Sequence, residues 1–387
     1  MKHQIPLRFA DFEPALHAAA RGETGFSDFG DPDYLLGLRR LIEAYAIDLP
    51  DDLATRQACF EMTLPGLIGR LYSERGWAEY PECLEASIVR PLIITGIPRT
   101  GTTALHMLLA MDPQFQGLEH WILTNPIVRP ARALWDAHPV YRRAVQRVEA
   151  LVESSPKIAD VHGIAAHDVD ECLPLMMQSF ITNQIPSLLH LPTYDEWFFT
   201  QDETASYRRL ADNLRLIGFA EPEKTWLLKN PTDLMRMETL LAVFPDARVI
   251  HTHRDPVPTF GSLCSMLSAY RGNPAPGSPE ACVIGPRQLR FYKIGIEHTM
   301  AVRERHPGAF HDVYQPALRA DPMRVVHGIY ERFELELTRE AEQRMQRWVA
   351  EHSEGAGRQH HYDCEGFGLS AAEIRQAFGG YMARYDL

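Results

Sequence analysis

An apolar run that ends in a glycine-rich turn constrains this chain more than any other part of its sequence. Residues 92–95 read LIIT, and the segment that follows, Gly96–Thr103, reads GIPRTGTT and opens a helical pattern. A buried strand, a turn and a helix in this order are typical of the phosphate-binding loops of α/β proteins. In such loops, backbone N–H groups and the positive end of the helix dipole hold an anion.

The loop differs from that of ordinary nucleoside triphosphatases at one position. The spacing GxxxxGK(S/T) is kept, but Thr102 stands where a lysine would reach the β- and γ-phosphates. This substitution argues against ordinary hydrolysis of ATP or GTP, while Arg99 still supplies a positive charge at the tip of the loop. The loop therefore suits a shorter phosphate chain.

A second segment with phosphate-binding residues follows another apolar run. The sequence THRDPVPTFGS places Arg254 at the carboxyl end of a strand predicted over residues 247–252, and Ser262 lies eight residues later in the next helix. Ligands of open α/β sheets bind at this edge, so the arginine and the serine can converge on one phosphate. A rival interpretation makes Asp255 a metal-binding acid, as in a magnesium-dependent kinase.

The surrounding elements predict an α/β fold with a parallel central sheet flanked by helices. Strand patterns at residues 226–228 and 247–252 enclose a helical pattern at 234–243, which implies right-handed crossovers between parallel strands. We expect a single domain over residues 1–387. Its predicted parts are a helical N-terminal segment (1–90), the strand, phosphate loop and helix (91–127), a helical insertion (128–225), the α/β core with the second phosphate motif (226–270), a flexible loop (271–289) and a helical C-terminal part (290–387) that includes a capping box at Ser370 and Glu373.

Charge and composition exclude several classes of protein. The chain has 39 basic and 51 acidic residues, a net charge of −12, which argues against nucleic acid as a partner. Its six cysteines form no CxxC pair, so we predict neither a disulfide framework nor a metal site. No apolar run has the length of a signal peptide core or of a membrane span. We expect a cytoplasmic protein without an integral membrane segment, and the sequence leaves its oligomeric state open.

Several motifs together resemble a bacterial family of sulfotransferases that use 3′-phosphoadenosine-5′-phosphosulfate (PAPS). That family shares a PxxIxGxPRxGTT loop, an HxxxxxxxxEC segment, a WxLKxP motif, a THRDP motif and a C-terminal tract ending in FGL. The corresponding parts here are PLIITGIPRTGTT, His162 with Glu171 and Cys172, Trp226–Pro231, Thr252–Pro256 and Phe367–Leu369. The resemblance spans nearly the whole chain and includes DFGD at Asp28–Asp31.

The resemblance implies transfer of a sulfuryl group from PAPS to a hydroxyl or amine, with release of adenosine 3′,5′-bisphosphate. By position, the loop would hold the 5′-phosphosulfate, and Arg254 with Ser262 would hold the 3′-phosphate. The loop residues concerned are Arg99, Thr100, Gly101, Thr102 and Thr103. The missing Walker lysine agrees with this assignment, because PAPS has no γ-phosphate to neutralise.

Sulfuryl transfer needs positive charge at the leaving oxygen and a base for the acceptor. Lys229 ends the predicted strand beside the loop, and with Arg99 it is our candidate for stabilising the leaving group. His162 is the first candidate base, because imidazole titrates near neutral pH and this histidine precedes Cys172 by ten residues, as in the family. Asp233 and Glu171 are the alternatives, since burial can raise the pKa of a carboxyl group.

Two positions depart from the family pattern. Similar sequences carry a histidine where this chain has Asp233, and their Trp-Glu pair reads Trp121-Ile122 here. Aromatic residues in HLPTYDEWFFTQD (190–202) suit the wall of an apolar acceptor pocket, although core packing is the default for such side chains. We expect a hydrophobic small-molecule acceptor. The alternatives are a magnesium-dependent P-loop kinase and a nucleotide-binding protein without catalysis.

Overall fold

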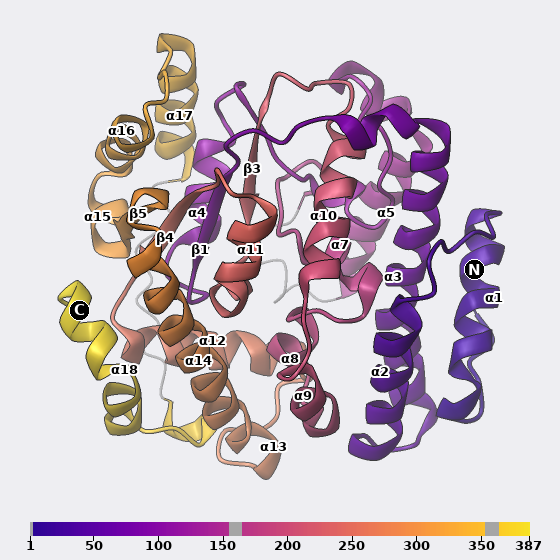
Figure 1. The fold of residues 1–387 in the computed structure, drawn as a ribbon. Coiled ribbons are helices and arrows are strands. Elements are labelled where there is room, and N and C mark those ends of the chain that lie inside the picture. Colours follow the sequence, from indigo (N-terminus) through magenta and orange to yellow (C-terminus); the bar gives the residue numbers. More distant parts are fainter. Residues whose placement is uncertain (1–2, 155–164, 353–363) are drawn as a thin grey trace. The chain divides into compact units, whose positions relative to one another are not determined.

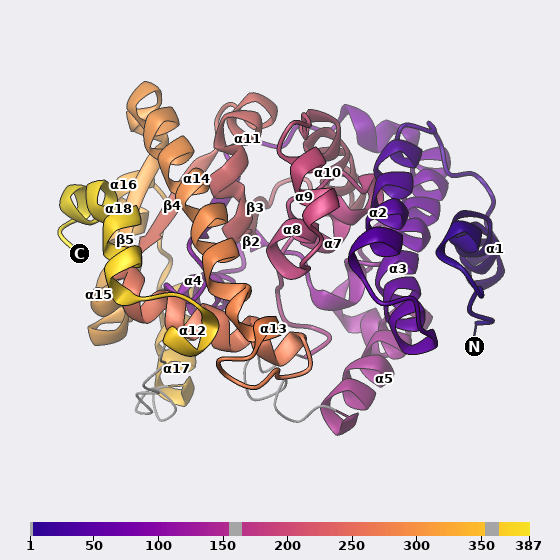
Figure 2. The same ribbon diagram turned by 90° about the horizontal axis from the view of Figure 1, so that it is seen from below.

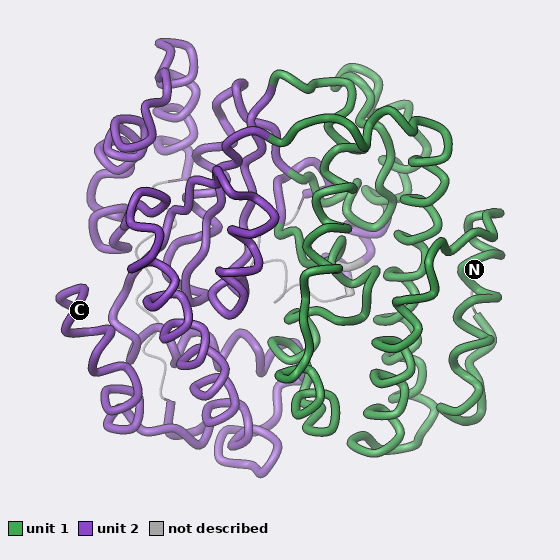
Figure 3. The backbone as a smooth tube through the Cα atoms, viewed as in Figure 1, with its two compact units in different colours: residues 1–88, 118–146, 171–223 green, residues 89–117, 147–170, 224–387 purple. Residues whose placement is uncertain are grey.

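The computed structural model of the chain describes residues 3–154, 165–352 and 364–387. The chain forms two compact units, and each unit is assembled from three separate stretches of sequence (Figure 3). Unit 1 comprises residues 1–88, 118–146 and 171–223, and unit 2 comprises residues 89–117, 147–170 and 224–387. The single domain over residues 1–387 stays a prediction.

Unit 2 is built on a parallel five-stranded sheet with the strand order β2-β3-β1-β4-β5 (Figure 1). Its strands are β1 (Leu92–Gly96), β2 (Phe115–Gln116), β3 (Thr225–Lys229), β4 (Arg248–His253) and β5 (Phe310–Tyr314). In the central strand, Leu92 pairs with Leu227 on one side and with Arg248 on the other. Every residue of β1 and β4 is buried, as expected where helices cover both faces of a parallel sheet. The predicted α/β fold is confirmed.

Two groups of helices cover the sheet of unit 2, and both can be followed in Figures 1 and 2. One face carries α4 (Thr102–Leu109), α15 (Gln315–Ala320), α16 (Pro322–Phe333) and α17 (Arg339–His352). Side chains of these helices form one apolar core with Ile94 and Ile250 of the sheet. The second group, whose members contact one another, is α11 (Met237–Val243), α12 (Pro256–Tyr270), α14 (Ile284–Arg305) and α18 (Ala371–Tyr385).

Unit 1 is helical in its described residues. Its long helices are α1 (Phe12–Thr24), α2 (Tyr34–Asp48), α3 (Leu53–Glu79) and α10 (Thr204–Ile217), with the shorter α7 (Leu173–Met176), α8 (Gln184–Leu188) and α9 (Pro192–Phe198). Helix α5 (Pro139–Ser154) starts in unit 1 and ends in unit 2. Fully buried Phe12, Leu38 and Tyr45 belong to one apolar cluster that joins α1, α2, α3 and α9.

A buried arginine explains the DFGD segment of unit 1. Arg70 of α3 is 1% exposed, and its guanidinium group donates hydrogen bonds of 2.5 Å to the backbone carbonyls of Phe29 and Asp31. The same group pairs with the carboxylate of Asp33 at 3.0 Å and lies 4.3 Å from the ring centroid of Tyr34. This segment therefore serves the core of unit 1, since it satisfies a cation that is costly to bury.

The structure corrects two predicted boundaries in the second half of the chain. The part predicted as helical, residues 290–387, contains strand β5, whose burial is interrupted by polar His311 and Asp312, so its sequence shows no continuous apolar run. The predicted flexible loop at 271–289 is wrong for its second half, where α13 (Pro279–Cys282) and the first turns of α14 lie. Ser278 caps α13 by accepting a hydrogen bond from the backbone N–H of Ala281 at 3.2 Å.

Candidate functional site

The predicted phosphate loop leaves the carboxyl end of β1 and enters α4 in an unusual backbone conformation. A Cβ atom on Gly96 would lie 2.2 Å from Oγ1 of Thr252 and 2.7 Å from its carbonyl oxygen, so only glycine fits there. Gly101 has a φ of 94° and precedes α4 directly. Arg99 has a φ of 75°, in the left-handed region that residues with a side chain rarely adopt. Its backbone strain marks the tip of the loop as a functional position.

Two buried threonines tie this loop to β4. The hydroxyl of Thr100 donates to the carbonyl of Ile97 at 2.7 Å, and the hydroxyls of Thr100 and Thr252 lie 2.5 Å apart. Thr252 in turn donates to the carbonyl of Thr95 at 3.3 Å. The side chain of Thr100 therefore shapes the loop. The sequence analysis missed the part that Thr252 plays here, although this residue opens the THRDP motif.

Three of the residues predicted to bind phosphate meet at the carboxyl edge of the sheet. The guanidinium Nε of Arg99 donates to Oγ of Ser262 at 3.0 Å. Nη1 of Arg254 donates to the backbone carbonyl of Arg99, also at 3.0 Å. The two arginines come from different strand ends, and the serine lies on α12. The guanidinium group of Arg99 contacts the serine hydroxyl, and that of Arg254 contacts the backbone of Arg99. Two cations and a hydroxyl at one edge of the sheet suit a phosphate dianion.

Asp255 is engaged at the start of α12. Its Oδ1 accepts a hydrogen bond of 2.9 Å from the backbone N–H of Val257, which makes it the N-cap of the helix. The kinase alternative assigns this carboxylate to a magnesium ion. Capping already accounts for Asp255 in this fold.

Lys229 lies where the sequence analysis placed it, at the end of β3 and beside the phosphate loop. Its Nζ donates to Oγ1 of Thr103 at 3.3 Å, and the lysine is 3% exposed. Thr103 is in the first turn of α4, so the ammonium group lies next to the positive end of this helix. A buried cation in this position favours an anion at the loop.

Asp233 is held by a compact set of hydrogen bonds just after β3. Nδ2 of Asn230 donates to Oδ1 of Asp233 at 2.6 Å, and Oδ1 of Asn230 accepts from the backbone N–H of Thr232 at 3.0 Å. The carbonyl of Asn230 accepts from the hydroxyl of Thr95 at 2.9 Å, which connects this turn to β1. Asp233 is buried at 2% exposure. The turn therefore brings this carboxylate to the same edge of the sheet as the loop.

A family model described as the sulfotransferase family matches residues 91–339, which is more than half of the chain. The chain belongs to the sulfotransferase family. The crystal structure of sulfotransferase STF1 from Mycobacterium tuberculosis is similar with a TM-score of 0.81 and 34% sequence identity, over 95% of this chain and 98% of that one. Sulfotransferase STF9 from Mycobacterium avium has a TM-score of 0.85 and 26% identity, over 100% of this chain and 99% of that one.

A relative with a named acceptor matches part of this chain. The omega-hydroxy-beta-dihydromenaquinone-9 sulfotransferase Stf3 of Mycobacterium bovis is 29% identical over 199 residues. The match covers 47% of this chain and 46% of the relative, so the chain spans about half the length of the curated protein it matches.

The other two candidate bases, His162 and Glu171, lie outside unit 2 or outside the described residues. His162 lies outside the described residues. Glu171 is a half-buried residue of unit 1 and precedes Cys172 and helix α7, whereas Lys229 and Asp233 belong to unit 2. The roles of His162 and Glu171 therefore stay predictions.

The sequence analysis missed a buried histidine network next to Arg254. His253 contacts Asp312 of β5 through Nε2 at 2.8 Å and Tyr381 of α18 through Nδ1 at 2.9 Å. Arg303 of α14 donates to both carboxylate oxygens of Asp312 at 2.5 Å. Burial lowers the pKa of His253. Although burial alone would raise it, hydrogen bonds from His253 and Arg303 hold the pKa of Asp312 well below its usual range.

This network also contains a set of metal-ligand residue types. The side-chain atoms of His251, His253 and Asp312 lie within 4.8 Å of one another. Because Arg303 occupies both oxygens of Asp312 and brings its own positive charge, we interpret the cluster as an ion pair of Arg303 with Asp312 to which His253 adds a hydrogen bond. It joins β4, β5 and α14. In the sequence, the two histidines at alternate positions of the buried strand RVIHTH indicate this cluster.

The aromatic segment predicted as an acceptor wall packs in a core instead. Tyr194 and Phe198 are 1% and 0% exposed and belong to the apolar cluster of unit 1. The hydroxyl of Tyr194 donates to the carbonyl of Phe180 at 2.7 Å. Their helical spacing on α9 serves the contact of α9 with α2, and so the pocket-wall interpretation is wrong for these two residues.

No helix among the described residues combines the length and the apolar character that crossing a membrane requires.

Proposed function

We propose that this sulfotransferase transfers the sulfuryl group of PAPS to a hydroxyl or amine of a hydrophobic small molecule. The observation that carries the proposal is the contact of Arg99, Arg254 and Ser262 at the carboxyl edge of the sheet. Membership of the sulfotransferase family supports the reaction. The name of the relative Stf3 specifies an omega-hydroxy menaquinone, which supports a lipophilic acceptor with a hydroxyl group.

The donor is held by two phosphate subsites whose residues contact each other. In our proposal, Arg99–Thr103 binds the 5′-phosphosulfate with backbone N–H groups at the start of α4, and Arg254 with Ser262 binds the 3′-phosphate. The hydrogen bond from Arg99 to Ser262 supports adjacent subsites. A compact bisphosphate fits this arrangement better than an extended triphosphate, because Thr102 has no charge to offer a γ-phosphate.

The reaction then needs charge compensation where the leaving group forms. The acceptor oxygen attacks sulfur, the bond from sulfur to the 5′-phosphate oxygen breaks, and that oxygen keeps the electron pair. Lys229, the hydroxyl of Thr103 and the N-terminus of α4 stabilise the new charge on adenosine 3′,5′-bisphosphate. The proton of the acceptor passes to a base. His162 is the first candidate, with Asp233 and Glu171 as alternatives.

Binding and transfer assays test this function against its rivals. The expected result is that adenosine 3′,5′-bisphosphate binds with magnesium chelated and that sulfate is transferred from PAPS to a hydroxylated lipophilic acceptor. Tight, magnesium-dependent ATP binding would instead support the kinase. Bisphosphate binding without turnover on a broad acceptor panel would favour a nucleotide-binding protein without catalysis.

The base is assigned by matched variants. His162→Ala should lower turnover and leave the affinity for the bisphosphate unchanged, because a base acts on the acceptor. If turnover of His162→Ala equals that of the wild type, Asp233→Asn and Glu171→Gln decide between the two carboxylates.

We also propose that the protein works in the cytoplasm. Its six cysteines are free thiols, which a reducing compartment favours.

A further inference from the structure

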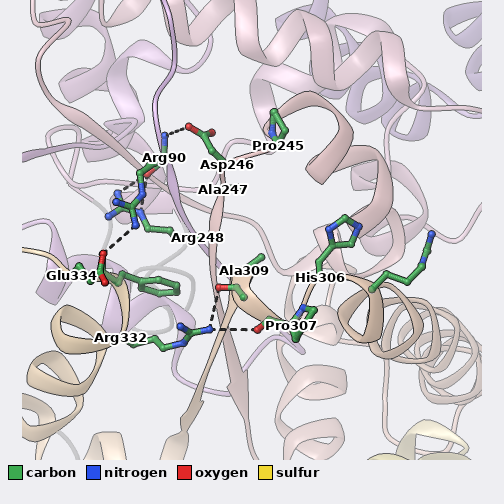
Figure 4. Close-up of a pocket in the computed structure, with 13 residues that line it drawn as sticks. Arg90, Pro245, Asp246, Ala247, Arg248, His306, Pro307, Ala309, Arg332 and Glu334 are labelled. Carbon is green, nitrogen blue, oxygen red and sulfur yellow. Dashed lines mark hydrogen bonds between the residues drawn. The ribbon is translucent and has the colours of Figure 1, made fainter.

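A cationic cavity in unit 2 is shown in Figure 4. It lies where the strands of the sheet begin, at the end opposite to the phosphate loop. Its volume is about 550 Å³, and it is formed where β4 and β5 begin, next to the last turn of α16. Arg248 is the first residue of β4, and Arg254 follows the last residue of the same strand. Six residues of strand separate the two edges by roughly 20 Å. The cavity is therefore distinct from the proposed donor site.

Positive charge exceeds negative charge around this cavity. Its charged lining residues are four arginines and two acids: Arg90, Arg248, Arg305, Arg332, Asp246 and Glu334. Arg305 pairs with Glu238 at 2.7 Å. The other three arginines form no ion pair with any described residue, because their hydrogen bonds go to backbone carbonyls. A carbonyl satisfies an N–H group and leaves the charge of the guanidinium uncompensated.

Arg248 is the most buried of these cations, at 6% exposure. Its Nε and Nη2 donate to the carbonyl of Arg90 at 3.0 and 2.5 Å. Burial, and then the positive charge of Arg90, lowers the pKa of Arg248 to about 10. The carboxylate of Asp246 acts in the opposite direction and offsets only part of this shift. Arg248 is therefore a buried cation next to a second, exposed guanidinium group, and no acid pairs with it directly.

The guanidinium groups are held in place before any ligand arrives. The backbone N–H of Arg90 donates to Oδ2 of Asp246 at 2.8 Å, and its guanidinium donates to the carbonyl of Phe333 at 3.3 Å. Arg332 reaches across the cavity to the carbonyl of Gly308 at 3.0 Å, and Figure 4 shows the hydrogen bonds of both arginines. Fixed side chains lose little conformational entropy on binding, which favours a built site over a mobile charged surface.

We propose that this cavity binds a dianionic oxyanion, namely the phosphate or sulfate group of a small metabolite or the inorganic ion. Three arginines without an acid partner supply positive charge and their remaining N–H donors to a tetrahedral oxyanion. The cavity exceeds the space that a single tetrahedral ion needs, so an ester of modest size also fits. A neutral or cationic ligand would leave the excess positive charge uncompensated.

The test places a carboxylate inside the cavity. Ala309 lines the cavity and contributes none of the hydrogen bonds that hold the arginines. Ala309→Glu supplies an internal anion that competes with the ligand, and Ala309→Gln is the matched variant of equal size without charge. Inorganic phosphate and phenyl phosphate are titrated calorimetrically into full-length protein saturated with adenosine 3′,5′-bisphosphate, at constant ionic strength.

The expected result is phosphate binding to the wild type and to Ala309→Gln, with at least tenfold weaker binding to Ala309→Glu. Glu334→Gln removes an opposing charge at an exposed position, and it should bind phosphate two- to fivefold more tightly. No heat of binding in the wild type up to 20-fold above cellular phosphate levels, or equal affinities of the Ala309 pair, would overturn the site. The difference between the Ala309 variants is independent of PAPS chemistry, so failure of the proposed function leaves this test intact.

Discussion

Arg254 supports the backbone of Arg99: its guanidinium donates a hydrogen bond of 3.0 Å to the Arg99 carbonyl. Arg99 is the loop residue with a left-handed φ of 75°. The arginine of the THRDP motif thus stabilises the strained tip of the loop, in addition to the phosphate contact that we propose for it. The phosphate loop and the THRDP motif, which lie about 150 residues apart in the sequence, therefore support each other in the fold.

Replacing Arg254 should weaken binding of adenosine 3′,5′-bisphosphate. Arg254→Ala removes a charge-assisted hydrogen bond and the support of Arg99, which together cost about 1.5 to 3 kcal/mol, or roughly 10- to 150-fold in Kd. Arg254→Lys keeps the charge but cannot donate two parallel hydrogen bonds, so its Kd should lie between those of the wild type and the alanine variant. Calorimetry measures all three, and an unchanged Kd in Arg254→Ala would contradict the assignment.

Replacing Lys229 should affect turnover more than binding of the product. Lys229→Met keeps most of the apolar stem and removes the ammonium group to which we assign stabilisation of the leaving phosphate, so kcat should fall by about 10²-fold or more. Thr103→Ser keeps the hydroxyl that contacts Lys229 and should stay close to wild type. Steady-state kinetics with PAPS give both values. A loss confined to KM in Lys229→Met would assign the lysine to binding alone.

Adding a methyl group at Gly96 should damage the loop. The new Cβ of Gly96→Ala would lie 2.2 Å from Thr252, and we expect a loss of roughly 2 kcal/mol or more in the free energy of unfolding, together with loss of bisphosphate binding. Gly22→Ala is the matched control, because Gly22 lies within helix α1 with open space around it. That variant should be stabilised by about 0.5 to 1 kcal/mol. Urea unfolding measures the free energy of unfolding of both variants. Equal changes in Gly96→Ala and Gly22→Ala would contradict the close contact of Gly96 with Thr252.

Acid should destabilise the fold through buried histidines. Burial, with a contribution from the charge of Lys229, lowers the pKa of His106 on α4 to about 3. The unfolded chain titrates near 6.5, so the neutral histidine contributes its full stability above that pH and loses it as the pH falls toward 3. The loss at pH 5 is about 2 kcal/mol for this residue.

His106→Leu removes this titration and provides the measurement. The difference in unfolding free energy between pH 7.5 and pH 5 should be smaller in the variant by about 2 kcal/mol. Burial also lowers the pKa of His251, so part of the acid sensitivity should persist. If the variant and the wild type lose equal stability between these two pH values, His106 does not carry the effect.

The sequence predicted those parts of the fold whose signals are local. Residues 92–95 form a strand because a continuous apolar run before a glycine has few alternatives, and the capping box of Ser370 with Glu373 is present at the start of α18. Strand β5 was missed because an edge strand buries only some of its side chains, so Phe310 and Val313 stand among polar residues. Pairing with β4 supplies what this local pattern lacks.

The sequence predicts which residues belong to the candidate site, but it does not predict which side chains contact one another there. Sequence position relative to a strand end was enough to bring Arg254, Ser262 and Lys229 to the carboxyl edge of the sheet. The contact of Thr100 with Thr252, and that of His253 with Asp312, join residues that are 152 and 59 positions apart. Such contacts depend on the order of strands in the sheet. The periodicity of apolar residues within one segment does not determine that order.

The interleaving of the two units constrains the order in which the protein is completed during its synthesis. The chain passes between the units at residues 88–89, 117–118, 146–147, 170–171 and 223–224, so no single cut in the gene separates them. The residues of unit 1 have all been synthesised at position 223, while β1 still lacks both strands that pair with it, β3 and β4. Until β4 has left the ribosome, the apolar strand before the loop lacks at least one of its two neighbours and needs protection from aggregation.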